Sequence, residues 1–127
     1  MYDRAWATVL LWLTPSCLMT GMFAASHGQH DTALGEIAVF ASSMMHWRSP
    51  KPGWSRWRVV DMITVQTSLA VHLRAMWAAG AVAACVVMTV ALACFGWSLQ
   101  RNSYAHHAAG WLAACASNVL LTYARAS

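Results

Sequence analysis

Hydrophobic positions in this chain occur in long runs that short polar stretches interrupt. The first and the fourth run are each long enough to cross the roughly 30 Å hydrocarbon core of a bilayer as one helix. The pattern predicts an all-α fold, a polytopic transmembrane helical bundle that forms a single integral membrane domain over residues 1–127. Five segments are expected, at residues 5–25, 32–47, 59–73, 75–99 and 104–124.

Prolines and glycines indicate where the segments are separated. Residues 48–58 contain two prolines and one glycine, so we expect a surface loop there. A continuous helix from Val59 to Leu99 would be about 60 Å long, twice the thickness of a bilayer, so we place a break between Arg74 and Gly80. We expect the first segment to be retained rather than cleaved as a signal peptide, because residues 1–4 carry no net positive charge.

Composition supports the membrane interpretation. Apolar residues make up 59% of the chain and charged residues only 9%, whereas a soluble domain has about 25% charged residues. This scarcity excludes a disordered chain or a basic nucleic-acid-binding arm, although the net charge is +4. The expected partners are other membrane protein subunits and lipids.

The basic residues predict an orientation. Five crossings put six of them on the side of the N-terminus and two on the other side. By the positive-inside tendency the N-terminus faces the cytoplasm, or the matrix or stroma of an organelle. A re-entrant second segment would leave four segments and remove this agreement. The two groups are Arg4, Arg48, Lys51, Arg56, Arg58 and Arg101 against Arg74 and Arg125.

Polar residues within the predicted spans are candidates for function, because ionisable groups are costly in hydrocarbon. In the arrangement with five crossings Ser42, His46, Asp61 and His107 all lie near the basic side. Ser42 and His46 are four residues apart and share a helix face. The imidazoles of His46 and His107 could hold zinc, with Asp61 orienting a water molecule for hydrolysis.

Ser42, His46 and the downstream Asp61 resemble the Ser-xxx-His and Asp pattern of the alkaline ceramidase and progestin-receptor-like superfamily of membrane hydrolases. The resemblance extends over residues 8–75 and 106–123. It implies a zinc-dependent hydrolase of lipid amides with Ser42 and Asp61 as catalytic residues. Those families close their site with an HxxxH motif, which starts here at His107 and has Trp111 in place of the second histidine.

Two other functions are compatible with the same residues. His46 and His107 could be axial ligands of haem or chlorophyll, since both are expected at a similar depth. Alternatively, the polar side chains form hydrogen bonds between helices and serve packing alone. We assign no cofactor from the sequence, and enzymatic activity stays open with the balance against it.

Four further features have ordinary structural interpretations. Asp61 is expected to pair with Arg58 or to cap its helix. Glu36 is expected to be solvated near the membrane interface, and Gln66 has no evident role. Each histidine by itself, His72 included, is expected at the level of the lipid headgroups. The cysteines lie in apolar runs and are interpreted as small buried hydrophobes, at positions 17, 85, 94 and 115.

Alanine and glycine recur at spacings of three and four in residues 78–84 and 105–114. Such stripes let helices approach closely, either within the chain or with another membrane protein. We therefore expect a non-enzymatic accessory subunit of a larger membrane protein complex. An organellar inner membrane such as the mitochondrial one is the expected location, with thylakoid or endomembranes as alternatives.

Overall fold

The computed structural model describes residues 3–51 and 53–127, and the regular structure within them is entirely α-helical. The predicted all-α class is confirmed for this part of the chain. Six helices follow one another: α1 (Arg4–Leu13), α2 (Pro15–Ser26), α3 (His30–Trp47), α4 (Arg56–Ala79), α5 (Val82–Arg101) and α6 (Tyr104–Ala126).

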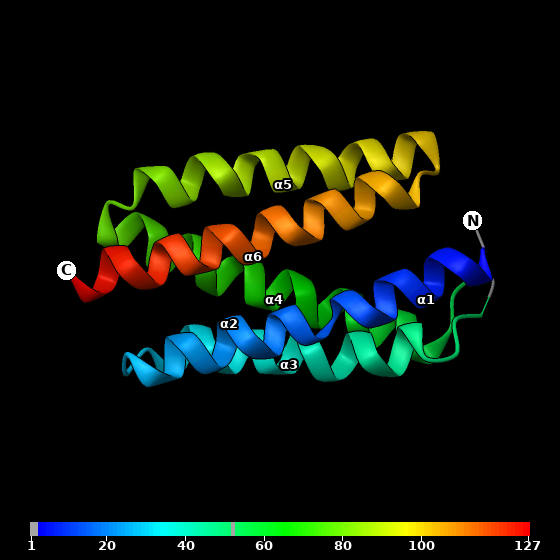
Figure 1. Cartoon of the computed structure of the whole chain (residues 1–127), viewed down its shortest axis with the longest axis horizontal. Coiled ribbons are helices and arrows are strands. Elements are labelled where there is room, and N and C mark those ends of the chain that lie inside the picture. The colour runs from blue at the N-terminus through cyan, green and yellow to red at the C-terminus, as the bar shows by residue number, and fades with distance from the viewer. Residues whose placement is uncertain (1–2, 52) are drawn as a thin grey trace.

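Helices α1 and α2 form one rod that is interrupted at Thr14 and Pro15 (Figure 1). Pro15 has no N–H to donate to the carbonyl of Leu11, four residues earlier. The hydroxyl of Thr14 donates to that carbonyl instead, at 2.7 Å. The rod therefore continues past the proline, as the single first segment of the sequence analysis requires.

The helices lie roughly antiparallel in an elongated bundle (Figure 1). The start of α1, the loop between α3 and α4 and the turn between α5 and α6 lie at one end, which we call the loop end. The opposite end, which we call the turn end, carries the α2–α3 and α4–α5 turns and the end of α6. The elements that contain the six basic residues grouped in the sequence analysis thus meet at the loop end.

The break between the third and fourth expected segments lies at Gly80, the last residue of the range predicted for it. Helix α4 continues through Arg74 to Ala79 and ends at Gly80, whose φ is +59°. Glycine adopts this left-handed conformation without the steric cost that a side chain adds. The break predicted between Arg74 and Gly80 is thus confirmed, although the expected segment bounds of 59–73 and 75–99 place it several residues too early.

The small residues of the two stripes pack α5 against α6. A Cβ atom at Gly110 would lie 3.0 Å from the carbonyl oxygen of Ala91, so the two backbones are in close contact there. The hydroxyl of Ser117 donates to the carbonyl of Ala84 at 2.7 Å. At these positions the small residues serve contacts within the chain.

Two stretches of helix are long and apolar enough to cross a membrane, Arg4–Ser26 and Val82–Arg101. Neither is a buried core helix, since only 33% and 22% of their apolar windows are buried inside the bundle. The other helices carry more polar residues, and many of these point into the bundle. That polar interior is the place to look for function.

Candidate functional site

Two buried polar clusters lie between the helices. The first, which we call the Asp61 cluster, lies toward the loop end and consists of Ser42, Ser43, His46, Asp61 and His107. The second, which we call the Glu36 cluster, lies toward the turn end and consists of Thr20, Glu36, Ser68, His72 and Asn118. Sequence analysis predicted the first and missed the second.

Asp61 is held by two serines of the neighbouring helix. The hydroxyls of Ser42 and Ser43 both donate to its Oδ1 atom, at 2.8 and 2.6 Å. The predicted pairing of Asp61 with Arg58 is wrong, since the Arg58 guanidinium donates to the carbonyl of Gly53. The predicted cap is wrong as well, because Ser55 caps α4 by accepting a hydrogen bond from the Arg58 N–H.

The two histidines of the Asp61 cluster meet at an indole ring. The Trp47 ring centroid lies 4.5 Å from that of His46 and 5.7 Å from that of His107. His46 is 8% exposed, and its Nδ1 atom has no hydrogen-bond partner among the described residues. The structure thus brings the four predicted residues to one end of the bundle: Ser42, His46, Asp61 and His107.

The cluster does not have the donor set of a metal site. Within residues 3–51 and 53–127 no three His, Cys, Asp or Glu side chains are grouped so that they could hold one ion. Trp111, at the position of the second histidine of HxxxH, donates its Nε1 proton to Ser16 Oγ at 2.9 Å. His106 is exposed and bonds to Ser103 at 2.8 Å, away from the cluster.

Glu36 lies at the meeting point of four helices. It is 3% exposed, so the predicted solvated position near the interface is wrong. Its carboxylate accepts hydrogen bonds from Thr20 of α2 and from Asn118 of α6, and it faces His72 of α4. One carboxylate thereby connects α3 to every other helix that surrounds it at this level.

His72 is 2% exposed, against the expectation of a position among the lipid headgroups. Its Nδ1 atom lies 2.7 Å from the backbone carbonyl oxygen of Ser68. A carbonyl oxygen only accepts, so Nδ1 carries a proton. Its Nε2 atom lies 3.1 Å from Glu36 Oε1, an ion-pair distance without hydrogen-bond alignment.

The Glu36–His72 contact has a defined chemical requirement. Two atoms with lone pairs at this distance need one proton between them, carried by the imidazole or by the carboxyl group. A buried pair of this kind avoids the large desolvation cost of an isolated carboxylate.

Two glycines allow the helices to close around Glu36. A Cβ atom at Gly35 would lie 2.7 Å from Ser68 Oγ, and one at Gly21 would lie 2.9 Å from the Glu36 Cβ atom. Helix α3 therefore approaches α4 and α2 more closely at this level than alanine would permit. Because Gly35 and Gly21 have no side chains, the helices come close enough for the Glu36 carboxylate to reach its partners on α2, α4 and α6.

Further polar contacts extend along α6 at both sides of the Glu36 cluster. Cys115 Sγ lies 3.9 Å from Cys17 Sγ, and both thiols are free. Both side chains are buried as predicted, whereas Cys85 and Cys94 are only partly buried. Toward the turn end, the Gln29 amide donates to the carbonyl of Thr122 at 2.9 Å. The inward residues of α6 follow a spacing of three or four that sequence reasoning could have used: His107, Trp111, Cys115, Asn118 and Thr122. The exposed Arg125 continues this spacing toward the turn end.

An ion pair closes this row at the turn end. Arg125 donates to both carboxylate oxygens of Asp31, at 2.9 and 3.3 Å. The Arg125 guanidinium lowers the pKa of the Asp31 carboxyl below its ordinary value. The carboxylate form is thus favoured by its neighbour, even though the pair is partly open to solvent.

Comparisons with family models, with curated proteins and with solved structures found no match to this chain. The resemblance to the ceramidase superfamily therefore stays a hypothesis that depends on Ser42, His46 and Asp61. Any functional conclusion has to come from the geometry of the two clusters and from the surface of the bundle.

Proposed function

We propose that this chain is a small polytopic membrane protein that acts as a non-enzymatic accessory subunit of a larger membrane protein complex. The observation that carries the proposal is the position of α5. It is the most apolar helix, yet only 22% of its apolar window is buried within the chain. In water such a surface would be a strong aggregation liability.

The exposed face of α5 combines bulky and small apolar residues. Val82 is 72% exposed, and Val86 and Val90 are 58% and 52% exposed. A Cβ atom at Gly96 would meet nothing within 4 Å, so this glycine serves no close contact among the described residues. Small residues on an outward face of a membrane helix allow a second helix to approach closely.

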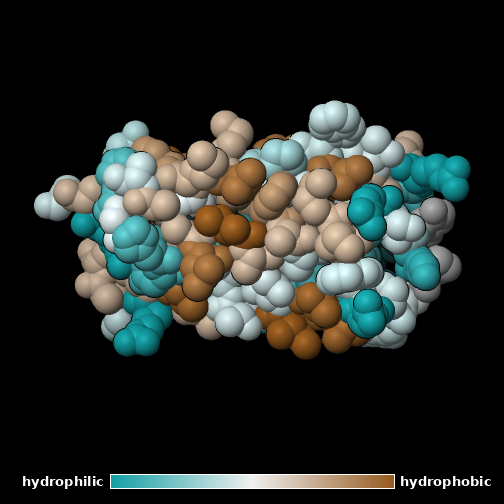
Figure 2. All heavy atoms as spheres, turned by 90° about the horizontal axis from the view of Figure 1, so that it is seen from below, coloured by the Kyte–Doolittle hydropathy of each residue, from teal (hydrophilic) through white to brown (hydrophobic). Residues whose placement is uncertain are grey.

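The distribution of polar groups supports a bilayer as the solvent. Figure 2 shows hydrophilic side chains gathered at the two ends of the molecule and apolar ones over much of its middle. Charged and polar residues such as Glu36, Asp61 and His72 are buried, whereas many large apolar side chains are exposed. Because their polar residues point inward, the mean hydropathy of α3, α4 or α6 is lower than the hydropathy of the outer surface of the same helix.

The ends of α4 support a transmembrane position for a helix with five ionisable residues. Trp54 and Trp57 are exposed beside Arg58 at the loop end, and Trp77 is 88% exposed beside Arg74 toward the turn end. Arg58 and Arg74 are sixteen residues apart, which is about 24 Å along a helix. Tryptophan and arginine at both interfaces are typical of a spanning helix.

The two clusters support a structural role. Asp61 accepts both serine hydroxyls, and Glu36 binds three side chains of other helices. Their polar contacts therefore lie within the chain, where they fix the register of the helices. The loops are short, so the intramembrane surface is most of what the chain presents to a partner.

Purification of the tagged chain in a mild detergent tests the proposal. Native electrophoresis should show a species larger than the monomer, and mass spectrometry should identify membrane proteins in it. Fractionation is expected to place the chain in an organellar inner membrane such as the mitochondrial one. Migration at the size of the monomer under every mild condition would contradict the proposed role.

A pair of variants tests whether the larger species depends on the outer face of α5. Gly96→Leu adds a bulky group to the outer face of α5 and should release the larger species while the helical content is unchanged. Leu34→Ala is the matched control, because Leu34 is 70% exposed on α3, away from α5. Equal loss of the assembly in both variants would contradict a docking role of the α5 face.

A second candidate function is the zinc-dependent membrane hydrolase that the resemblance implies, although the described residues of the Asp61 cluster include no group of three metal ligands. What supports it is the convergence of Ser42 and Asp61 with His46 and His107, together with the unpaired Nδ1 atom of His46. Metal analysis of the purified protein tests it. Stoichiometric zinc that is lost in His46→Ala would favour the hydrolase, and a metal-free protein would exclude it.

A further inference from the structure

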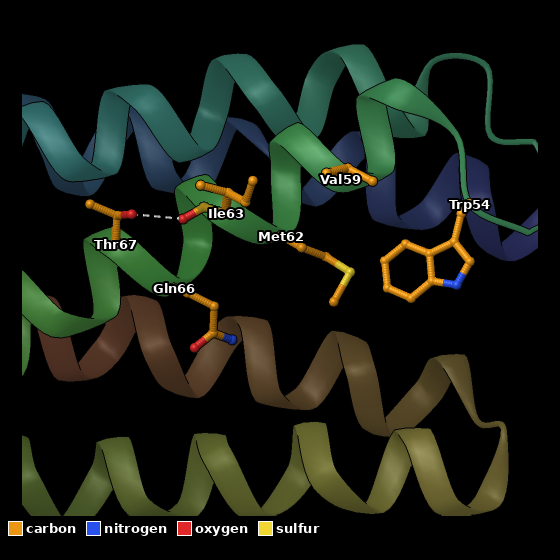
Figure 3. Close-up of a pocket in the computed structure, with 6 residues that line it drawn as sticks. All are labelled: Trp54, Val59, Met62, Ile63, Gln66 and Thr67. Carbon is orange, nitrogen blue, oxygen red and sulfur yellow. Dashed lines mark hydrogen bonds between the residues drawn. The ribbon is translucent and has the colours of Figure 1, made fainter.

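An open groove lies along the outer face of α4 near the loop end (Figure 3). We call it the α4 groove. Its volume is about 360 Å³, and it is lined by Trp54, Val59, Met62, Ile63, Gln66 and Thr67. Trp54 comes from the loop before α4, and the other five come from α4 itself. Figure 3 shows Met62 between the Trp54 indole and Gln66.

The lining is apolar except for two polar residues, Gln66 and Thr67. The hydroxyl of Thr67 is satisfied, because it donates to the carbonyl of Ile63 at 2.8 Å. Gln66 is exposed, and its amide has no hydrogen bond to another described residue. An amide that faces hydrocarbon requires a polar partner, and the ester carbonyl of a lipid can provide one.

The loop end of the groove is cationic. The Arg58 guanidinium carbon lies 5.4 Å from the centroid of the Trp54 ring that lines the groove. The Arg56 guanidinium carbon lies 5.5 Å from the Trp57 ring centroid in the same helical turn. Within the described part of the chain neither arginine forms an ion pair. An anion at the mouth of the groove would therefore meet two uncompensated cations.

We propose that the α4 groove binds an anionic phospholipid, with an acyl chain along Val59–Thr67 and its phosphate at Arg56 and Arg58. The inference rests on the proposed position of the chain in a membrane. Charge complementarity selects the headgroup, since cations near a membrane surface attract anionic lipids. The apolar lining suits an acyl chain. Trp54 is 73% exposed at the loop end, where an acyl chain would enter the groove from the membrane interface.

Photocrosslinking in vesicles tests the site. The purified chain is reconstituted into phosphatidylcholine vesicles with a small fraction of phosphatidylglycerol that carries a diazirine in its acyl chain. After irradiation, peptide mass spectrometry locates the adducts. Adducts should concentrate on Val59–Thr67 over the segment Val82–Val90 of α5, which is more apolar, and the same diazirine in phosphatidylcholine should show no such preference.

Single substitutions separate headgroup recognition from nonspecific lipid contact. In Arg58→Gln the excess of phosphatidylglycerol adducts on Val59–Thr67 should fall about fivefold, the effect of one cation near an anionic surface. Arg56→Gln should lower it in the same direction. Arg101→Gln is the matched control, because its guanidinium carbon lies 5.0 Å from the Trp97 ring centroid at the same end of the bundle, on α5.

The possible results distinguish failure of the lipid site from failure of the membrane position. A uniform distribution of adducts, or an excess that Arg58→Gln and Arg56→Gln leave unchanged, would overturn the lipid site. An equal fall in Arg101→Gln would also overturn it, because the effect would then come from net charge alone. Release of the chain from the vesicles by alkaline carbonate would instead contradict the membrane position itself. The two failures are thus distinguishable.

Discussion

The Asp61 and Glu36 clusters hold their carboxylates in different ways. Asp61 is bound by two adjacent serines of a single neighbouring helix, both at one oxygen atom. Glu36 uses both oxygen atoms and contacts a different helix with each partner, α2, α4 and α6. The first arrangement joins one helix pair, whereas the second joins α3 to three other helices.

This difference predicts that the two carboxylates contribute different amounts to the free energy of unfolding. Removal of Asp61 leaves two hydroxyl groups that can turn to a backbone carbonyl, as Ser42 already does toward Val39 at 3.2 Å. Removal of Glu36 leaves the His72 imidazole and the Asn118 amide without their common partner, while the Thr20 hydroxyl keeps the carbonyl of Cys17 as an acceptor at 3.1 Å. A buried group that loses its partner and cannot find another is the more costly case.

The largest effect is expected for Glu36→Ala. The substitution should lower the free energy of unfolding by about 3–5 kcal/mol, because it leaves His72 and Asn118 buried without their partner. Unfolding of the detergent-solubilised protein by sodium dodecyl sulfate, followed by circular dichroism, measures it. Glu36→Gln is the control and should cost only about 1 kcal/mol, since its amide can donate to His72 Nε2.

The second effect in size is expected for Asp61→Ala. We expect a loss of about 2–3 kcal/mol, the range of hydrogen bonds to a charged group. Asp61→Asn keeps the Oδ1 acceptor of both serines and should be close to the wild type. If Asp61→Ala proves as costly as Glu36→Ala in the same assay, the ranking of the two clusters is wrong.

The two clusters also differ in how far the sequence reveals them. Ser42 and His46 are four residues apart, so helical periodicity alone puts them on one face. Glu36 binds partners that are 16, 36 and 82 residues away in the chain, at Thr20, His72 and Asn118. Which of these single polar residues face one another depends on the relative rotation and register of four helices, which a hydrophobic pattern leaves undetermined.

The helices themselves follow from the sequence more directly. Apolar runs and polar interruptions predict all-α structure and the loop that precedes α4. Helix length predicts a break between Arg74 and Gly80, and the backbone conformation of Gly80 places it at the end of that range. Arg58 was assigned to Asp61 from their spacing, but the serines of α3 satisfy that carboxylate.

Substitutions at Gly35 and Gly96 compare a glycine in close contact between α3 and α4 with a glycine on the outer surface of the bundle. Gly35→Ala places a Cβ atom 2.7 Å from Ser68 Oγ, so we expect a loss of about 1–3 kcal/mol from overpacking. Gly96→Ala meets nothing within 4 Å and should be neutral or stabilising by up to about 1 kcal/mol, from helix propensity. The same unfolding assay compares them, and equal costs would contradict a special approach of α3 to α4.

The smallest effect is expected at the turn end, where the polar contact is an exposed ion pair and not a buried cluster. Arg125 lowers the pKa of Asp31, so the contribution of the pair is present above the ordinary aspartate pKa and is lost as the pH falls through the lowered value. We expect about 0–1 kcal/mol, because the side chain of Asp31 is half exposed and screened by solvent. Unfolding at neutral pH and at about pH 2, in wild type and Asp31→Asn, measures the difference. The variant should be less stable at neutral pH and approach the wild type in acid; a gap that persists at low pH would mean that Asp31 acts through a contact other than its charge.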